Sequence, residues 1–531
     1  MAESPQRLFA NAFSIPVPTD LFAFENLWRQ YRICRRNKRN TINQLRFELD
    51  AEAQLLTLQQ ELRAHTYQPG QSICFVTDGP KPREVFAADF RDRIVHHVLV
   101  SQQERVFEPR FIHDSYACRP GKGVLAASNR LMQFLRRVTA NGRRAAWALK
   151  LDVASFFSSI HKQTLYGIIG RHVRDPEVLW LTSTVLFHDP TADYRFKSGP
   201  RHTPPPGSGR YPVPQQKSLF GKGNECGLPI GNLTSQFWAN VYLDELDQFV
   251  KRTLKCRYYV RYVDDLVLLD TNPETLRQWR EAIAAFVGER LELHLRERHA
   301  KPQPATRGID FVGWNTFWNH RRPRGRTLAN CEARVTRFAR RELQSWWGGA
   351  ARRLDVERQA QALPGLRATL ASYSGHLRHG AAHQKWLALW KRHGWLRAFF
   401  AQRQHDPWDV HARWPERRLG GPRFSSQYSR LIRHAGHDAL VFCHVGRFLE
   451  FYGPQRLLAA RALQLMRVGI ARGGFAFSVG VPQRLSGAYI ARAVRAGYAV
   501  AEVREVDRLS RTCAVRQVVA VWIPAVWRGE E

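Results

Sequence analysis

Two adjacent aspartates, Asp264 and Asp265, lie between two apolar, β-prone runs in residues 259–270. Polar residues between two such runs predict a hairpin turn, so both carboxylates are expected near its tip. An upstream apolar run, 147–151, ends at Asp152, and a strand ending there can bring a third carboxylate to the pair. Carboxylate oxygens are ligands that Mg²⁺ prefers, and Mg²⁺ keeps open positions for substrate phosphates. The pattern therefore points to phosphoryl transfer supported by two Mg²⁺ ions.

The composition agrees with a nucleic-acid partner. The chain has 531 residues, with 81 Lys and Arg against 46 Asp and Glu, which gives a formal net charge of +35. This charge favours phosphate backbones, although a solvated basic surface or membrane attraction would carry it too. An Asp-Asp pair alone is also common in ordinary turns. A hydrophobic content of 44% with 16 Trp excludes a disordered basic tail, and the length predicts about three to four domains.

The cysteines and the apolar runs suggest a cytosolic protein. The eight cysteines include no Cys-x-x-Cys pair, so neither a zinc ribbon nor a disulfide framework is predicted. The first residues contain no uninterrupted apolar signal segment, and no apolar run reaches about 18 residues. We therefore expect no secretion, no membrane partner and a cytoplasmic location.

Two further segments suggest a family. The first, Asp-Ser-Tyr-Ala-Cys-Arg-Pro-Gly-Lys-Gly at 114–123, precedes Asp152, and the second, Gly-Leu-Pro-Ile-Gly-Asn-Leu-Thr-Ser-Gln at 227–236, precedes the Asp-Asp pair. In this order the segments resemble the fingers and palm motifs of bacterial reverse transcriptases of the group II intron and diversity-generating retroelement lineage. The first is not a Walker A loop, because no Ser or Thr follows its lysine. An ATPase site is therefore not predicted there.

The second segment narrows the resemblance. Most reverse transcriptases start this motif with Gln-Gly and end it with Ser-Pro, whereas this chain has Ile230 before Gly231 and Gln236 after Ser235. This pattern resembles the enzymes of diversity-generating retroelements in particular. A glutamine can hydrogen-bond near the incoming nucleotide, whereas isoleucine offers only shape, and apolar shape discriminates by about 1–3 kcal/mol. We therefore expect low copying fidelity.

The resemblance implies a catalytic site and a set of substrate contacts. Asp152, Asp264 and Asp265 would hold two Mg²⁺ ions with the carbonyl of Val153, and the same three aspartates would be catalytic. The substrate-binding residues implied are Lys81, Arg83, Arg93, Phe157, Ile230, Gly231 and Gln236. Phe157 matches the aromatic side chain that excludes a ribose 2′-hydroxyl, with a core position as its alternative. The three basic residues would meet the triphosphate and the template, with surface ion pairing as their alternative.

Segments 291–295 and 308–314 resemble the last two palm motifs. The resemblance implies that Gly313 and Trp314 contact the primer end. Relatives place lysines between these motifs, whereas this chain offers a choice of basic residues that stays open: Arg298, His299 or Lys301. The amphipathic pattern that follows predicts helices, which would form the thumb.

The last hundred residues resemble the N-terminal mismatch-recognition domain of the repair protein MutS. Phe448 and Glu450 fall on its Phe-x-Glu motif. The resemblance implies that Phe448 wedges beside a mispaired base and that Glu450 hydrogen-bonds the base. A phenylalanine wedge senses how easily a base step unstacks. Phe448 can equally be a core residue, and Arg447 replaces the usual aspartate, so mismatch sensing stays open.

These segments together predict an α+β right-hand polymerase, with fingers, palm and helical thumb, followed by a small C-terminal α/β module like MutS domain I. The expected boundaries are an N-terminal helical extension at 1–70, fingers and palm at 71–320, a helical thumb at 321–400, a linker at 401–426 and the MutS-like mismatch-recognition-type domain at 427–531.

The resemblance implies RNA-directed DNA synthesis in a bacterial-type cytoplasm. The template would be the repeat RNA of a diversity-generating retroelement, copied with errors at adenines into cDNA for transfer to a variable repeat. The implied partners are the template RNA, the primer and cDNA duplex, deoxynucleoside triphosphates and a small accessory protein. Two alternatives stay open: a related reverse transcriptase in phage defence or another retroelement, and a nonenzymatic RNA-binding scaffold.

Overall fold

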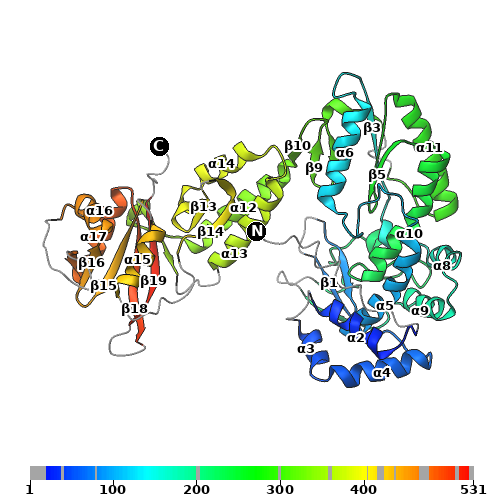
Figure 1. The fold of residues 1–531 in the computed structure, drawn as a ribbon, viewed down its shortest axis with the longest axis horizontal. Helices are drawn as coiled ribbons and strands as arrows, with labels where there is room; N and C mark the ends of the chain where they lie inside the picture. Colours follow the sequence, from blue (N-terminus) through cyan, green and yellow to red (C-terminus); the bar gives the residue numbers. More distant parts are fainter. Residues whose placement is uncertain are drawn as a thin grey trace. The chain divides into compact units, whose positions relative to one another are not determined.

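The chain folds into two compact units, Met1–His320 and Arg321–Glu531. A computed structural model describes residues 20–36, 41–77, 81–198, 204–296, 301–356, 362–403, 405–414, 424–435, 438–465, 478–508 and 514–524 (Figure 1). Among these residues, no helix has the length and apolar character needed to cross a membrane.

The first unit consists of helices around small sheets. Its helices are α2 (Phe24–Arg35), α3 (Ile42–Glu48), α4 (Ala51–Arg63), α5 (Phe90–Phe107), α6 (Val124–Val138), α7 (Phe156–Ser159), α8 (Lys162–Gly170), α9 (Pro176–Leu186), α10 (Leu233–Gln248) and α11 (Pro273–Leu291). Two of them begin with a strong local signal. Asp175 and Asn272 accept hydrogen bonds from first-turn N–H groups, and a proline follows each cap. Such caps satisfy donors that a helix start leaves unpaired.

The sheet that positions the aspartates has the strand order β5-β6-β3-β7. Its strands are β3 (Trp147–Asp152), β5 (Tyr258–Tyr262), β6 (Asp265–Asp270) and β7 (Gln303–Pro304). Alternate residues of β6 face two cores. Leu266 and Leu268 pack into a core that includes α10 and α11, and Val267 and Leu269 pack into a core that includes α6. Figure 1 shows β3 and β5 between α6 and α11, so both faces of the sheet are covered.

Two smaller sets of strands complete the first unit. A second sheet has the order β2-β1-β4. Its strands are β1 (Ser72–Val76), β2 (Glu84–Ala87) and β4 (Tyr194–Phe196). A separate antiparallel pair is formed by β8 (Ile309–Phe311) and β9 (Trp314–Thr316).

The second unit is built on a seven-stranded sheet with the order β11-β12-β19-β18-β15-β16-β17. Its helices are α12 (Gly325–Glu342), α13 (Ala362–Leu377), α14 (His383–Arg392), α15 (Phe424–Ala435), α16 (Pro454–Leu463) and α17 (Ser486–Arg495). Its strands are β10 (Arg321–Pro323), β11 (Gln344–Trp346), β12 (Ala351–Asp355), β13 (Phe400–Arg403), β14 (Asp406–Ala412), β15 (Ala439–Val445), β16 (Phe448–Tyr452), β17 (Ser478–Pro482), β18 (Ala499–Arg508) and β19 (Ala514–Pro524).

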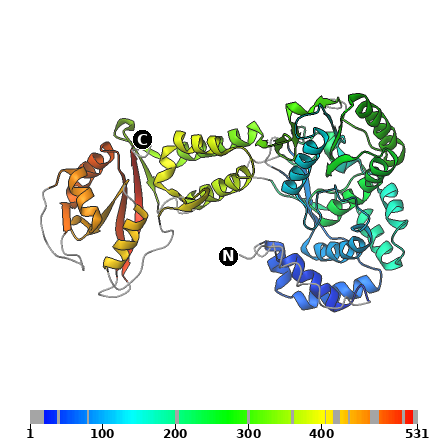
Figure 2. The ribbon, with the colours of Figure 1, turned by 45° about the horizontal axis from the view of Figure 1, so that its top comes forward.

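Helices cover both faces of this sheet. One core contains Tyr428 of α15 with Val441 and Cys443 of β15. The other contains Leu440 and Phe442 of β15 with residues of α16 and α17. Figure 2 shows helices on either side of the long red strands β18 and β19.

The sheet joins segments that the sequence predicted as separate domains. β12 pairs with β19, with Ala351 opposite Pro524. Trp386 of α14 lies in the same hydrophobic core as Val441 of β15. Residues 344–346 and 351–355 are strands where a helical thumb was expected, and β13 and β14 form a hairpin inside the expected linker. The helical segment and the C-terminal sheet therefore share one core.

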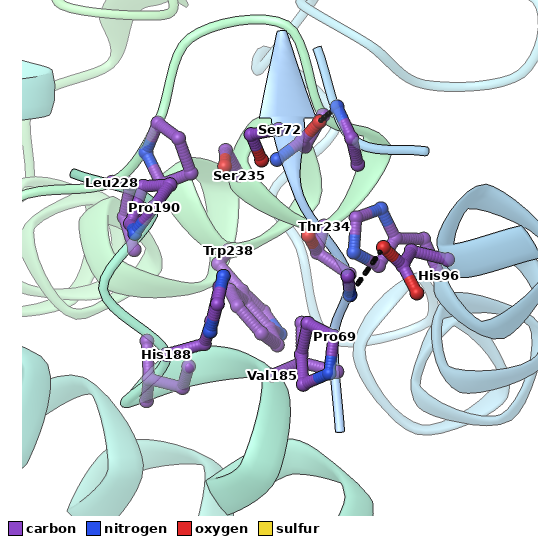
Figure 3. Close-up of a pocket in the computed structure, with 16 residues that line it drawn as sticks. Pro69, Ser72, His96, Val185, His188, Pro190, Leu228, Thr234, Ser235 and Trp238 are labelled. Carbon is purple, nitrogen blue, oxygen red and sulfur yellow. Dashed lines mark hydrogen bonds between the residues drawn. The ribbon is translucent and has the colours of Figure 1, made fainter. Parts of the chain in front are cut away.

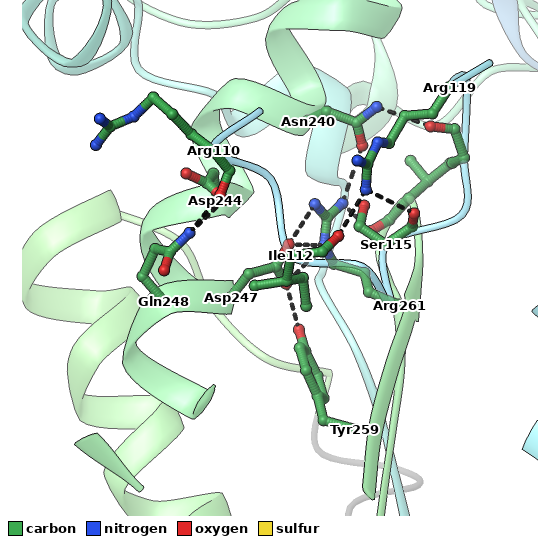
Figure 4. A network of polar contacts seen from close by, with 12 residues as sticks. Arg110, Ile112, Ser115, Arg119, Asn240, Asp244, Asp247, Gln248, Tyr259 and Arg261 are labelled. Carbon is green, nitrogen blue, oxygen red and sulfur yellow. Dashed lines mark hydrogen bonds and ion pairs between the residues drawn. The ribbon is translucent and has the colours of Figure 1, made fainter. Parts of the chain in front are cut away.

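A charged pair lies completely inside the first unit (Figure 4). Arg261 of β5 donates through Nε and Nη2 to the carboxylate of Asp247 in α10, at 2.6–2.9 Å, and both side chains are 0% exposed. The Tyr259 hydroxyl also donates to Asp247, at 2.7 Å. Arg261 Nη1 donates to Asn240 Oδ1 at 3.1 Å. A buried charge must be paired and hydrogen-bonded in this way to be tolerated, so the pair ties α10 to the sheet.

Removal of Arg261 should destabilise the first unit strongly. Arg261→Ala leaves Asp247 charged, buried and without its main partner, so we expect a loss of about 3–5 kcal/mol of unfolding free energy. Urea unfolding followed by circular dichroism measures it. The exposed neighbour Arg257 provides a matched control, and Arg257→Ala should change stability by less than about 0.5 kcal/mol. Equal losses in the two variants would show that the buried pair has no special role.

Candidate active site

Strand register brings the three predicted aspartates together. Asp152, the last residue of β3, lies directly opposite Asp265, the first residue of β6. Asp264 lies in the turn that joins β5 to β6, where Tyr262 pairs with Asp265. The side chains of Asp152 and Asp265 are 23% and 31% exposed. The three carboxylates therefore form one partly accessible acidic site at the end of the sheet.

The turn that holds Asp264 has an unusual backbone. Val263 has a φ of 55°, a conformation that a β-branched residue rarely adopts because of steric crowding. The carbonyl of Val263 accepts a hydrogen bond from Arg261 Nη1 at 3.2 Å. The buried arginine therefore reaches the turn directly, and surrounding structure of this kind is what keeps a strained backbone in place.

The fingers motif lies along the same strand. The N–H of Arg261 donates to the carbonyl of Asp114 at 2.9 Å, and the N–H of Tyr116 donates to the carbonyl of Arg261 at 3.0 Å. Arg119 Nη1 donates to the carbonyls of Ile112 and Ser115 at 2.6 and 3.0 Å, which fixes this segment internally (Figure 4). Two predicted motifs are thus joined by backbone bonds.

The site concentrates negative charge. The pKa of Asp264 is raised to about 6, mainly by burial and also by the charges of Asp152 and Asp265, while Arg83 acts to lower it. Two cations lie against the outer carboxylates: Arg296 Nη1 is 2.6 Å from Asp152, and Lys150 Nζ is 3.1 Å from Asp265. Crowding of this kind costs free energy unless positive charge is supplied.

The chemistry of the donors fits a hard divalent cation. Three carboxylates, one of them desolvated beside two like charges, are what such an ion would stabilise. In the part of the chain that the structure describes, no three His, Cys, Asp or Glu side chains are already arranged around a metal position. Asp152 and Asp265 are paired instead with Arg296 and Lys150. Metal binding would therefore require these ion pairs to rearrange.

The segment 227–236 is fixed against β2. The carbonyl of Ile230 accepts a hydrogen bond from the N–H of Phe86 at 3.0 Å. Gly231 has a φ of 120°, and a Cβ there would lie 2.8 Å from Val85 Cγ1 and 3.2 Å from the Phe86 carbonyl oxygen. Only glycine suits both the backbone conformation and the close approach. Gln236, at the far end of the segment, accepts a hydrogen bond from the Cys118 thiol at 3.5 Å.

Phe157 links this segment to the turn after Asp152. It lies in α7 and is half-buried against the main core. Its carbonyl accepts a hydrogen bond from the N–H of Leu228 at 2.7 Å. The backbone of Phe157 therefore adjoins segment 227–236, and the half-buried position leaves part of the residue accessible.

A separate polar pocket lies behind the same segment (Figure 3). Its lining includes Asp92, His96, His188 and Ser235. Burial lowers the pKa of His96 to about 3 and raises the pKa of Asp92 to about 6. Within the described residues, His96 Nδ1, His188 Nε2 and Ser235 Oγ have no hydrogen-bond partner. Buried polar atoms of this kind are commonly satisfied by internal water. The lining of the pocket contains none of the three aspartates of the acidic site.

The predicted basic residues are divided between two places. Lys81 and Arg83 are exposed just before β2, and the effect of Arg83 on the pKa of Asp264 places its charge close to the acidic site. Arg93 lies in α5, where its Nε donates to the Ala88 carbonyl at 2.9 Å. The charge of Arg83 therefore acts on Asp264, whereas Arg93 is held against the backbone near the pocket.

The last palm motifs differ from the prediction in one respect. Gly313 is in the β8–β9 turn with a φ of 94°. Trp314 is only 1% exposed, so its ring is enclosed in the protein interior and is not accessible to a primer in this structure. Lys301 is exposed, and Arg298 and His299 lie outside the described residues.

Arg296 is a site residue that the motif comparison missed. Its guanidinium contacts Asp152, and its N–H donates to the Asp152 carbonyl at 2.8 Å. It comes directly after segment 291–295, and that position next to a recognised palm motif was the available signal.

The two predicted mismatch residues lie in different environments. Phe448 begins β16 and is 47% exposed. Glu450 is only 6% exposed and accepts a hydrogen bond from the Tyr452 hydroxyl. β16 is an internal strand between β15 and β17, so its middle residue is enclosed. Phe448 is therefore accessible to a ligand, whereas Glu450 is not available to hydrogen-bond a base in this structure.

Comparison with known proteins finds related sequences for both units. Protein YkfC of Escherichia coli (strain K12) is 24% identical over 214 residues, which cover 39% of this chain and 48% of that protein. The group II intron-encoded protein LtrA of Lactococcus lactis subsp. cremoris is 22% identical over 203 residues, 38% of this chain and 28% of that protein. The chain therefore spans less than half the length of these relatives. A telomerase structure from Candida albicans, in complex with a fragment of telomeric RNA, has a TM-score of 0.33 and 12% identity, covering 60% of this chain and 55% of that chain.

The family models match each unit separately. Residues 79–316 match the model described as reverse transcriptase (RNA-dependent DNA polymerase), and they include all three aspartates of the acidic site. Residues 422–528 match MutS domain I and include β15 to β19. The chain therefore contains a segment similar to reverse transcriptases, followed by a segment similar to MutS domain I.

Proposed function

We propose that the protein is an RNA-directed DNA polymerase of a diversity-generating retroelement, which copies a template-repeat RNA into cDNA with frequent errors at adenines for transfer to a variable repeat. The observation that carries the polymerase activity is the register of β3 and β6, which puts Asp152 opposite Asp265 with Asp264 in the adjoining turn. The sequence of segment 227–236, with Ile230 at its fourth position, supports the retroelement assignment.

Each charged residue has a separate role in this proposal. Asp152, Asp264 and Asp265, with the Val153 carbonyl, would hold two Mg²⁺ ions, which when bound supply stabilisation of the attacking and leaving oxygens. Arg83 and Arg296 bring positive charge to the same site and suit the triphosphate of the incoming deoxynucleotide.

Two apolar side chains would select the nucleotide. Phe157 would exclude a ribose 2′-hydroxyl, and the bond from Leu228 to its carbonyl keeps it beside the segment that contains Ile230. Ile230 would contact the nascent base pair by shape alone, which discriminates weakly. Low fidelity follows from the chemistry of this one position.

The MutS-like domain would hold a structured RNA or a primer-template duplex and so replace or supplement a small accessory protein. Its exposed Phe448 supports a nucleic-acid contact. Because the domain shares a core with α13 and α14, deletion of residues 431–531 would uncover that core and would not test the domain alone. Point variants on its surface are the appropriate probes.

Asp264→Asn should abolish DNA synthesis and at the same time stabilise the metal-free protein. The folded state raises the pKa of Asp264 from 3.8 to about 6. The contribution of the protonated Asp264 side chain to the free energy of unfolding is therefore present at low pH and is lost as the pH rises through that window. The free energy of unfolding of the neutral variant should exceed that of the wild type by about 1–3 kcal/mol at pH 7 in EDTA. Primer extension and denaturant unfolding at pH 5 and pH 7 measure both effects. The control Asp270→Asn, at the far end of β6, should extend primers normally. Activity retained by Asp264→Asn would refute the assignment of Asp264 as a catalytic residue and would favour a nonenzymatic RNA-binding scaffold.

Gly231→Ala should slow nucleotide incorporation. The added Cβ meets Val85 and the Phe86 carbonyl, so the segment must move, and a displacement of about 1 Å can cost about 100-fold in rate. Single-nucleotide incorporation gives kcat/KM for this variant and for the control Gly288→Ala, whose Cβ on α11 meets nothing within 4 Å. Incorporation by Gly231→Ala at the control rate would show that the segment does not position the nucleotide.

Ile230→Gln should lower misincorporation opposite template adenines, because glutamine adds a hydrogen-bonding group where isoleucine offers only shape. Sequencing of the cDNA made from the neighbouring repeat RNA, with errors counted by template base, measures the change. Ile230→Val keeps the apolar character and should keep the error spectrum. An unchanged spectrum in the glutamine variant would remove Ile230 from the explanation, and faithful wild-type cDNA would point to phage defence or another retroelement instead.

A further inference from the structure

The hairpin of β11 and β12 carries two adjacent tryptophans at its tip. Trp346 is 40% exposed and Trp347 is 36% exposed. Trp347, Gly348 and Gly349 have φ angles of 50°, 63° and 93°, and a Cβ added at either glycine would meet nothing within 4 Å. The tip is therefore open on the described surface, and the tight turn displays both indoles there.

A third tryptophan supports the two exposed rings. The ring centroid of Trp522 in β19 lies 5.2 Å from those of Trp346 and Trp347, in an edge contact and a stacked contact respectively. The Arg353 guanidinium carbon also lies over the Trp522 ring, 5.4 Å from its centroid. Trp522 itself is only 7% exposed. The two exposed indoles therefore pack on the buried ring of Trp522. This support reduces the conformational entropy that they would lose on binding a ligand.

The exposure of this pair contrasts with the burial of three other tryptophans of the second unit. Trp386, Trp390 and Trp414 are at most 6% exposed. Tryptophan carries a large apolar surface that folding normally covers, and adjacent exposed aromatic residues mark interaction sites more often than isolated ones. The hairpin therefore has the character of a binding surface.

The charge around the hairpin indicates what binds there. Residues 334–353 contain six arginines and one acidic residue, Glu342. Arg337, Arg340 and Arg341, at the end of α12, are exposed, and the chain runs from them directly into the hairpin. Aromatic rings that stack with bases, beside arginines that meet phosphates, are the combination that binds single-stranded nucleic acid without sequence preference.

We propose that Trp346 and Trp347, supported by Trp522 and Arg353, form a stacking platform for single-stranded RNA outside the polymerase domain. The choice of RNA rests on the proposed function, since the template is the strand that such an enzyme holds unpaired on its flanks, whereas the cDNA is paired as it forms. In this arrangement Trp346 and Trp347 each stack on one base, and the arginines of α12 contact the phosphates of the RNA backbone.

The test uses the full chain with the double variant Trp346→Ala/Trp347→Ala. The probe is a uridine-rich RNA of about 15 nucleotides, bearing a fluorophore and photoreactive 4-thiouridine. We expect affinity by fluorescence anisotropy to fall about 10- to 100-fold, and wild-type crosslinks to map to residues 344–355. The variant Trp346→Phe/Trp347→Phe, which keeps aromatic faces, should recover most of the affinity. Leu457→Ala, which removes an exposed apolar side chain of α16, should bind like wild type.

The remaining outcomes separate this inference from the proposed function. Unchanged RNA affinity and absent crosslinks in an active polymerase would overturn the platform and leave the polymerase intact. Tighter binding of the matching single-stranded DNA would overturn the choice of RNA. Extension of a short primed template without flanks should be the same in the double variant and wild type. Loss of that extension would mean that the variant disturbs the polymerase or its folding, and the stacking role would then be rejected.

Discussion

The buried pair of Arg261 and Asp247 is the contact on which the acidic site depends. Through its side chain Arg261 binds α10 and the carbonyl of Val263, and through its backbone it binds the fingers motif. A guanidinium inside an apolar core is tolerated only when its donors are satisfied. The hydrogen bonds of Arg261 must therefore all be present in the folded protein. The same residue therefore fixes α10, the helix in which segment 227–236 ends, together with the strand that leads to the aspartates and the turn that presents Asp264.

The second unit is held together by a different principle. Its helices α13 and α14 and its C-terminal sheet bury the same core, and β12 extends the sheet from within the helical segment. A MutS-like domain attached by a flexible linker would move independently of its neighbours. Here the shared core couples that domain to the adjacent helices, so the nucleic-acid contacts proposed for Phe448 and for the β11–β12 hairpin would be made by one folded body.

The proximity of the three aspartates could be predicted from the sequence because its signal is local. Asp152, Asp264 and Asp265 end or begin apolar runs, and the two-residue period of a strand then determines their place. What was missed depends on contacts between distant segments. The pairing of Ala351 with Pro524 joins residues far apart in the chain, and nothing in the short run around it specifies a partner. The burial of Trp314 and Glu450 likewise follows from elements that cover them, which a motif cannot reveal.

The strand β12 also has a consequence for the behaviour of the protein in solution. β19 is eleven residues long and largely buried and apolar, and an uncovered strand of this kind is a template for pairing between molecules. β12 covers its last five residues, Ala520–Pro524, and the short strand β11 with its charged neighbours ends the sheet. The hairpin therefore leaves these residues of β19 unavailable for edge-to-edge pairing with another molecule.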